Sequence, residues 1–219
     1  MKNATRQLNK ATYLACIAII SLFACLTGCD ILALIGNPIP NDSGILTDGQ
    51  LSSNSSHDAT ELEQLALERI NHARLWPARE AELGGITVDE GIPGQIDESP
   101  KQAVAMNNIL RAAANAHSED MLVRDYFAHR NPDGDNPGDR VRANGYVWNL
   151  VGENLAWNGT TASLDPVEII EQQHDNLFID REIENRGHRL TMLHDELREV
   201  GISIVRGALP PAMSPIPTR

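Results

Sequence analysis

Residues 152–157 read Gly-Glu-Asn-Leu-Ala-Trp, and this stretch decides more about the fold than any other in the chain. It lies in a loop-rich region that runs from residue 124 to residue 159. One interpretation of Glu153 is a buried acid that only hydrogen-bonds loop backbone. The other interpretation is an acid that belongs to a ligand site. The choice between the two depends on which other residues the fold places near Glu153.

Five other motifs surround this stretch, and two of them contain a histidine of interest. Asp-Tyr-Phe-Ala-His ends at His129, and Gly-His-Arg contains His188. The six motifs lie, in chain order, at residues 113–121, 125–134, 139–146, 152–157, 187–193 and 199–202. Their order and spacing resemble the CAP superfamily (cysteine-rich secretory proteins, antigen 5 and pathogenesis-related 1; the SCP domain), specifically its bacterial branch. The resemblance covers roughly residues 60–205.

The resemblance implies an α+β fold, an α-β-α sandwich with a central cavity. Two histidines and two acids line that cavity in the family. Matched residue by residue, they include His129, Glu153 and His188. Imidazoles with a carboxylate suit a divalent metal such as zinc, with His129 and His188 as the expected metal ligands. A purely structural polar cluster is the competing interpretation.

The second cavity acid has no clear match in this chain. In the family it lies on the helix before the last histidine, where this chain has His174 in place of a usual tryptophan and an insertion-like stretch at 180–186. The candidates for the position are Glu171 and Glu182, with Asp180 and Glu184 as further alternatives. His174 faces inward in a helical pattern and, like His117, is expected to be a core histidine rather than a ligand.

Helix signals mark three segments. Thr60-x-x-Glu63 is a capping box, and Pro77 limits the helix that follows it. Ser99-Pro100-x-Gln102 and Asp165-Pro166-x-Glu168 are two further N-terminal signatures. The expected buried stripes are Met106, Leu110, Ala113, Ala114, His117 and Met121 in the second helix, and Val167, Ile170, His174 and Phe178 in the third. Val200, Ile202 and Ile204 alternate as in a strand.

The C-terminal end departs from the family pattern. Family members continue from the last matched strand into a final strand rich in aromatic residues. Here residues 208–219 form a tail with four prolines, which cannot form a central strand. We therefore expect the CAP-like domain to span residues 59–207, with its final strand missing or divergent and a neighbouring strand edge left unpaired.

The N-terminal end has the pattern of an exported lipoprotein. Three basic residues precede an apolar run of 13 residues from Leu14 to Leu26, too short to span a bilayer comfortably. Leu-Thr-Gly-Cys at residues 26–29 resembles a lipobox, which predicts a signal peptide at residues 1–28 and a lipid on Cys29. Residues 29–58, rich in Ser, Gly and Pro, are expected to be a flexible tether.

Charge and composition restrict the classes of molecule that this chain could bind. Without residues 1–28 the chain has 15 Lys and Arg against 30 Asp and Glu, a net charge of −15, which argues against a nucleic-acid partner. The expected location is the outer face of a cell membrane, through the lipid on Cys29. Asp30 resembles a retention signal for the periplasmic face of the inner membrane, if the source is Gram-negative.

Three functions are compatible with these motifs. The first is a membrane-tethered binding module whose cavity holds a divalent metal, a small molecule or a component of the cell envelope. The second is an interaction protein with an inert cavity. The third is a hydrolase that acts on peptide or envelope polymer through a histidine–carboxylate pair, although no nucleophile stands out and the catalytic residues are unknown. We rank the binding module first.

Overall fold

In the computed structural model, the described residues are 11–21, 60–160 and 165–208. Along the chain they form β1 (Ala11–Ser21), α1 (Glu61–Leu75), α2 (Pro77–Leu83), β2 (Ala105–Met106), α3 (Asn108–Arg124), α4 (Pro137–Ala143), β3 (Leu150–Thr160), α5 (Pro166–Ile179), α6 (Gly187–Met192) and β4 (Glu199–Ala208). Cys29, the whole expected tether and residues 209–219 of the tail lie outside the described residues.

Two of the three predicted helix starts are confirmed. The Thr60 hydroxyl accepts from the Glu63 backbone N–H, and the Glu63 carboxylate accepts from the Thr60 N–H, so the capping box is formed. The Asp165 side chain likewise accepts from the Val167 N–H at the start of α5. Pro77 follows the end of α1 and is also the first residue of α2. A proline suits this position, because the N–H that it lacks would have no partner within the helix.

The predicted start of the second helix is wrong by several residues. Residues 99–104 are irregular, and α3 begins only at Asn108. Asn107 is the N-cap, since its side-chain oxygen accepts from the N–H groups of Ile109 and Leu110. Met106 therefore lies on β2 and not on the helix, whereas the rest of the stripe is buried as expected. The stripe predicted for α5 is buried as well, except for Val167, which is exposed.

The four strands form one sheet in the order β2-β4-β1-β3. Strand β1 lies between β3 and β4 and pairs antiparallel with both. Its first residue, Ala11, lies opposite Thr160 of β3 and Ala208 of β4. Its residues 14–21 belong to the apolar run that the sequence assigns to an export signal. The short β2 pairs parallel with β4 at the other edge.

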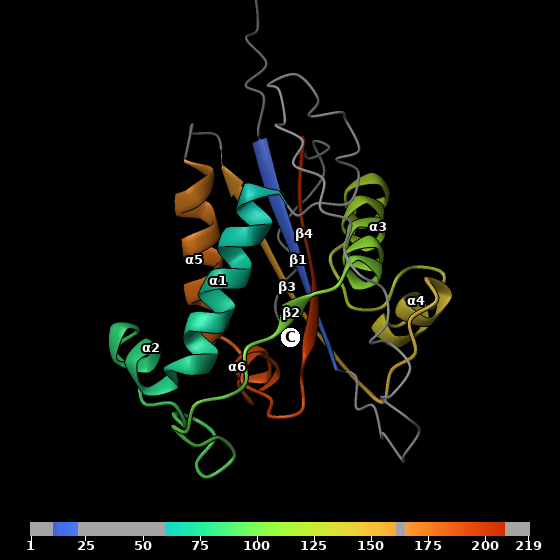
Figure 1. Ribbon diagram of the computed structural model, residues 1–219. Coiled ribbons are helices and arrows are strands. Elements are labelled where there is room, and N and C mark those ends of the chain that lie inside the picture. The colour runs from blue at the N-terminus through green and yellow to red at the C-terminus, as the bar shows by residue number, and fades with distance from the viewer. Residues whose placement is uncertain (1–10, 22–59, 161–164, 209–219) are drawn as a thin grey trace, which may run out of the picture.

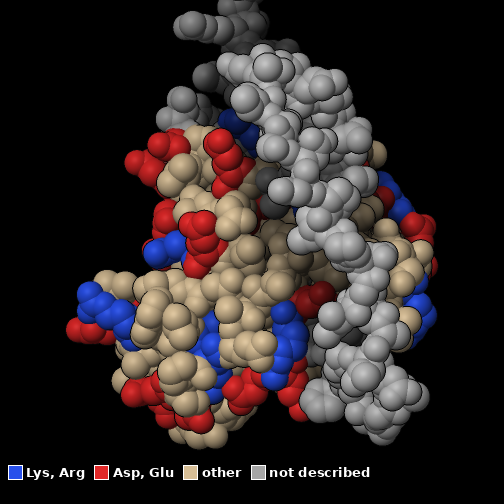
Figure 2. Space-filling view, viewed as in Figure 1, with Lys and Arg blue, Asp and Glu red and all other residues tan. Residues whose placement is uncertain are grey.

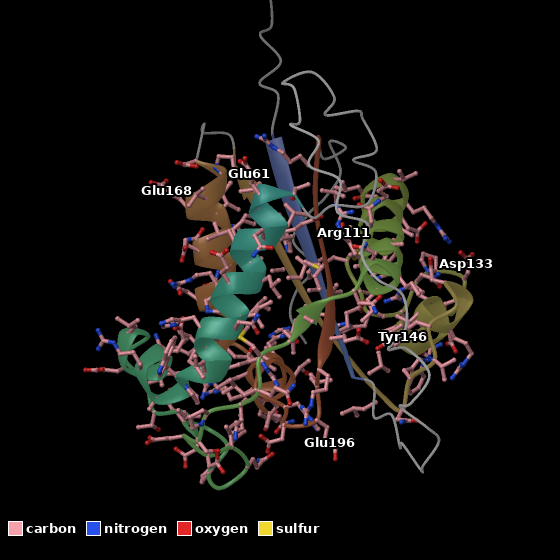
Figure 3. The ribbon with its side chains drawn as sticks, viewed as in Figure 1. Glu61, Arg111, Asp133, Tyr146, Glu168 and Glu196 are labelled. Atoms are coloured by element: carbon pink, nitrogen blue, oxygen red, sulfur yellow. The ribbon has the colours of Figure 1, made fainter. Side chains whose placement is uncertain are left out.

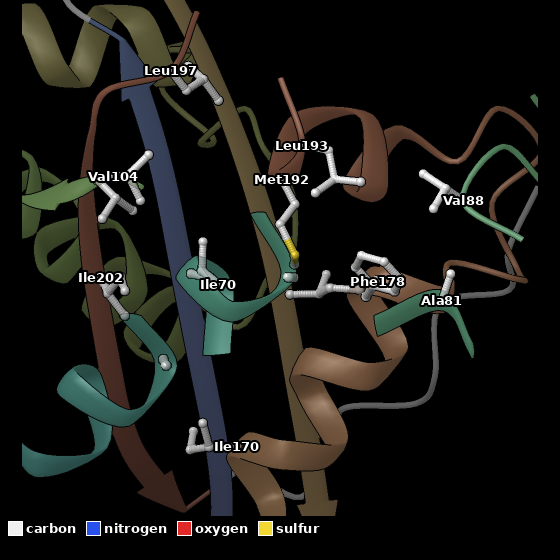
Figure 4. Packing of buried hydrophobic residues seen from close by; sticks show 14 residues of the cluster. Ile70, Ala81, Val88, Val104, Ile170, Phe178, Met192, Leu193, Leu197 and Ile202 are labelled. Carbon is white, nitrogen blue, oxygen red and sulfur yellow. The ribbon is translucent and has the colours of Figure 1, made fainter. Parts of the chain in front are cut away.

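Helices cover both faces of this sheet, as Figure 1 shows, with α1, α2, α5 and α6 on one side and α3 and α4 on the other. Each layer has its own apolar cluster. Ile70, Phe178 and Met192 belong to the first cluster, which Figure 4 shows against β4 and the sheet. Leu110, Met121 and Tyr146 belong to the second. The α+β class and the sandwich architecture are thus confirmed.

Two fully buried arginines hold the loops at one end of the first layer. The Arg74 guanidinium donates to the backbone carbonyls of Gln102, Met192, His194 and Leu197. The Arg189 guanidinium donates to those of Phe178, Ile179, Val88 and Glu90. Burial lowers the pKa of Arg74 to about 10, so the group stays charged at neutral pH. These contacts satisfy carbonyls that the helices and strands leave unpaired.

The surface carries the acidic character expected from the sequence. Figure 2 shows acidic side chains gathered over α1 and α5 on the visible face. None of the helices in the described part of the chain is both long and apolar enough to cross a membrane.

Candidate functional site

The first predicted pair, His129 and Glu153, is in direct contact. His129 lies in the loop between α3 and α4, and its Nδ1 is 2.9 Å from Oε1 of Glu153 on β3. The Glu153 side chain is 3% exposed, whereas that of His129 is 54% exposed. The acid is therefore buried below a histidine that faces solvent.

Arg140 of α4 compensates the buried charge of Glu153. Its Nη2 donates to Oε2 at 2.6 Å, while Nη1 donates to the backbone carbonyl of His129 at 2.8 Å. One guanidinium thus fixes both the acid and the loop that carries the histidine, as a buried carboxylate requires. The Asp-Arg motif at residues 139–140 was part of the sequence pattern, but its role as the partner of Glu153 was not predicted.

His117 of α3 lies behind this pair. Its Nε2 is 3.0 Å from the Ala128 carbonyl and 4.0 Å from Oε1 of Glu153. Burial lowers the pKa of His117, although the nearby Glu153 charge acts in the opposite direction. A neutral, buried and hydrogen-bonded imidazole agrees with the expected core role.

The second predicted histidine, His188, pairs with Asp180. Its Nδ1 is 2.8 Å from Oδ1 of Asp180, and the His188 backbone N–H donates to Oδ2 at 2.9 Å. Asp180 ends α5 in the left-handed conformation, with φ 53°, and its side chain is 1% exposed. The turn after α5 therefore places the Asp180 carboxylate next to the first residues of α6.

Among the four candidate acids, Asp180 is thus the partner of His188. Glu171 lies elsewhere on α5 and pairs with Arg69 of α1 at 2.8 Å. Glu182 and Glu184 are exposed, and neither has a hydrogen bond to His188 in the described part of the chain. The two acids that the sequence placed first, Glu171 and Glu182, do not contact a cavity histidine there.

The two histidine–carboxylate pairs belong to different layers of the sandwich. Glu153 contacts residues from the α3 and α4 side, whereas its neighbour Asn154 donates to the His188 carbonyl of α6 at 3.0 Å. Successive residues of a strand point to opposite faces, which explains the separation. His129, Glu153 and His188 do not form a group of ligand atoms within 4.8 Å among the described residues, so no zinc-dependent step follows from them.

A groove of about 470 Å³ opens beside the second pair. Its walls come from the end of the 125–127 segment, from β3, from the last turns of α5 and from the 180–183 loop. Half of the fourteen lining residues are apolar, and the other half, which includes His188 and Asp180, are polar or charged. The apolar members are Phe127, Leu155, Ala156, Trp157, Leu177, Ile179 and Ile183. A small ligand with an apolar body and one polar group fits such a lining.

An α-β-α sandwich with buried acids under two histidines defines the class of this chain, and comparisons with known proteins agree. Residues 67–209 match the family described as Cysteine-rich secretory protein family, CAP, so the chain belongs to that family. It is also similar to the "Uncharacterized protein YkwD" of Bacillus subtilis (strain 168), with 27% identity over 113 residues. That match covers 52% of this chain and 35% of the relative. No solved structure matches.

Proposed function

We propose that this CAP protein is a binding module, and that its ligand is a small amphiphilic molecule or an envelope fragment held in the groove between β3 and α5. The observation that carries the proposal is the lining itself. Apolar side chains from four parts of the chain converge there on a histidine whose orientation a buried carboxylate fixes. His188 Nε2 has no hydrogen bond to a described residue, so it remains available to a polar ligand group.

Trp157 gives the sharpest test, because its side chain lines the groove and is 39% exposed. We expect Trp157→Ala to weaken binding of a fluorescent fatty acid or a soluble peptidoglycan fragment by roughly tenfold, which corresponds to about 1.4 kcal/mol and to burial of part of an indole ring. His188→Gln should weaken binding as well. Fluorescence titration of both variants measures the effect.

Trp76 provides the matched control, since it is 52% exposed and does not line the groove. Trp76→Ala should leave binding unchanged. Equal affinities for wild type, Trp157→Ala and His188→Gln would remove the groove as the ligand site. They would leave an interaction protein with an inert cavity as the better description.

The proposed location is the outer face of a membrane, through a lipid on Cys29. The support is the lipobox-like segment that ends at Cys29, which follows a basic and then an apolar stretch. Cells grown with labelled palmitate should label the wild-type chain but not Cys29→Ser. A Cys29→Ser chain that remains labelled and membrane-bound would contradict the proposal.

A hydrolase is the second candidate, and one observation favours it. Glu153 holds His129 Nδ1, and Nε2 of this half-exposed ring has no hydrogen bond to a described residue, so it could accept a proton from water. Turnover of peptide or peptidoglycan substrates that His129→Gln abolishes would support this activity. Absence of turnover by the wild-type chain would exclude it for those substrates.

A further inference from the structure

A second set of potential ligands lies far from the family motifs, where α1, α2 and α5 meet on one side of the sheet (Figure 1). Glu80 belongs to α2, and the side chains nearest its carboxylate come from the two longer helices. Those neighbours are His72 of α1 and His174 of α5. The sharp turn between α1 and α2 at Trp76 and Pro77 brings Glu80 back toward α1.

Both carboxylate oxygens of Glu80 are occupied by imidazoles. Oε1 is 2.9 Å from His174 Nε2, and Oε2 is 2.6 Å from His72 Nδ1. Asp175 lies next to His174, and ligand atoms of Glu80, His174 and Asp175 are all within 4.8 Å of one another. One imidazole nitrogen and two carboxylates are donors that divalent transition metals accept.

The charge state of Glu80 suits a metal ligand. Its side chain is 4% exposed, and burial, the largest single influence, would raise its pKa. Hydrogen bonds from His174 and His72 together with the charge of Arg69 outweigh burial, so the pKa of Glu80 is lowered. The carboxylate is therefore ionised at neutral pH inside the helical layer.

Asp175 offers the remaining carboxylate and a path for an ion. It is exposed and makes no hydrogen bond or ion pair with any residue in the described ranges. An exposed acid beside a buried histidine–carboxylate pair lets an ion arrive from solvent and exchange its water for protein oxygen and nitrogen. No contact in the described part of the chain requires Asp175 for folding.

Arg69 is the competing cation. Its nearest nitrogen is 3.7 Å from Oε1 of Glu80, but its Nε is only 2.8 Å from Oε2 of Glu171. A dication at Glu80 is compatible with Arg69 held by Glu171, at the expense of repulsion between the two charges. Removal of the arginine charge should therefore strengthen metal binding, which a purely structural ion network does not predict.

We propose that Glu80, His174 and Asp175 form a binding site for one divalent transition metal ion such as zinc, with His72 holding the second oxygen of Glu80. Hydrogen bonds to a ligating carboxylate are a common outer-shell feature of metal sites, and their loss typically weakens affinity 10–100-fold. The site is independent of the groove and of the His129 and His188 pairs.

The experiment uses the full-length chain in mild detergent, freed of metal and carrying His129→Gln and His188→Gln so that the other histidine pairs cannot contribute. Titration with Zn²⁺ by calorimetry and with Co²⁺ by visible absorption reports affinity and coordination. We expect one ion per chain, with affinity reduced at least about tenfold by Asp175→Asn and by His174→Gln, and increased by Arg69→Gln. Glu168→Gln, an exposed acid at the start of the same helix (Figure 3), is the matched control and should change nothing.

The outcome at Asp175 decides the proposal, because this exposed residue can be changed without disturbing the core. Equal affinity for Asp175→Asn and its parent would overturn the site, as would absence of stoichiometric Zn²⁺ or Co²⁺ binding. Metal uptake by the unmutated chain that disappears with His129→Gln and His188→Gln would place the ion at the family cavity instead. The groove proposal is unaffected by either result, since its test reads ligand fluorescence.

Discussion

A chain that begins at residue 29 should not unfold cooperatively, whereas a chain that begins at residue 11 should. Strand β1 fills the position between β3 and β4, and it pairs with β3 along all its 11 residues and with β4 from Ala11 to Ile20. Each of these two pairings has roughly ten hydrogen bonds, and at about 1 kcal/mol net for each bond one pairing alone contributes about 10 kcal/mol. That is as much as the whole stability of a domain of ordinary size, about 5–15 kcal/mol. Circular dichroism and chemical denaturation of the two chains measure the difference.

A peptide of residues 11–21, made soluble by flanking lysines, allows a complementary experiment. Added to the chain that begins at residue 29, it should restore a cooperative transition, because β3 and β4 would each regain a partner. A peptide of the same composition in scrambled order is the control. If the chain from residue 29 unfolds cooperatively, with a Tm equal to that of the longer chain, the position between β3 and β4 does not require β1.

This prediction bears on the proposed lipid anchor, because cleavage before Cys29 would remove the strand that the sheet contains. Residues 14–21 would then belong both to the export signal and to the central strand of the sheet. In a processed chain the inner edges of β3 and β4 would be unpaired, and unpaired edges attract other strands. The truncation experiment therefore shows whether the processed domain needs a strand from another source.

The central strand could not be recognised from the sequence for a physical reason. An apolar run without alternation fits a signal peptide, a buried helix or a strand buried on both faces equally well, and periodicity does not separate them. By contrast, α1 and α5 were predictable, because Thr60 and Asp165 carry local capping signals that do not depend on the rest of the fold. The start of α3 was misplaced because Ser99 and Pro100 imitate such a signal, while Asn107 forms the actual cap.

The site was predictable to a similar degree. His129 and Glu153 lie within motifs, and the resemblance alone brought them together. Asp180 could be named only as an alternative, because its contact with His188 depends on a left-handed turn at the end of α5 that no local pattern indicates. No sequence pattern indicates a role for Glu80. His72 lies eight residues before Glu80 but on another helix, His174 is 94 residues away, and a single glutamate on a short helix carries no motif.

Gly201→Ala is the single substitution expected to have the largest effect on stability. Gly201 lies on β4 under α3, and a Cβ at this position would be 2.1 Å from the Leu110 carbonyl carbon and 2.3 Å from the Arg111 nitrogen. Both atoms belong to the helix backbone, so no side-chain rotation can relieve the overlap. The whole helix would have to move away from the sheet, and Leu110, which is fully buried, would lose its packing.

Overpacking of this kind costs about 3 kcal/mol, near the upper end of the usual range. For a domain of this size the Tm should fall by roughly 6–12 °C, which thermal unfolding by circular dichroism measures. Gly187→Ala is the matched control, because a Cβ there meets nothing within 4 Å and its stability should be almost unchanged. If Gly201→Ala were as stable as Gly187→Ala, α3 could not pack as closely on β4 as described. The position of His117 of α3 relative to Glu153 of β3 would then need revision, because the close packing at Gly201 sets the distance of α3 from the sheet.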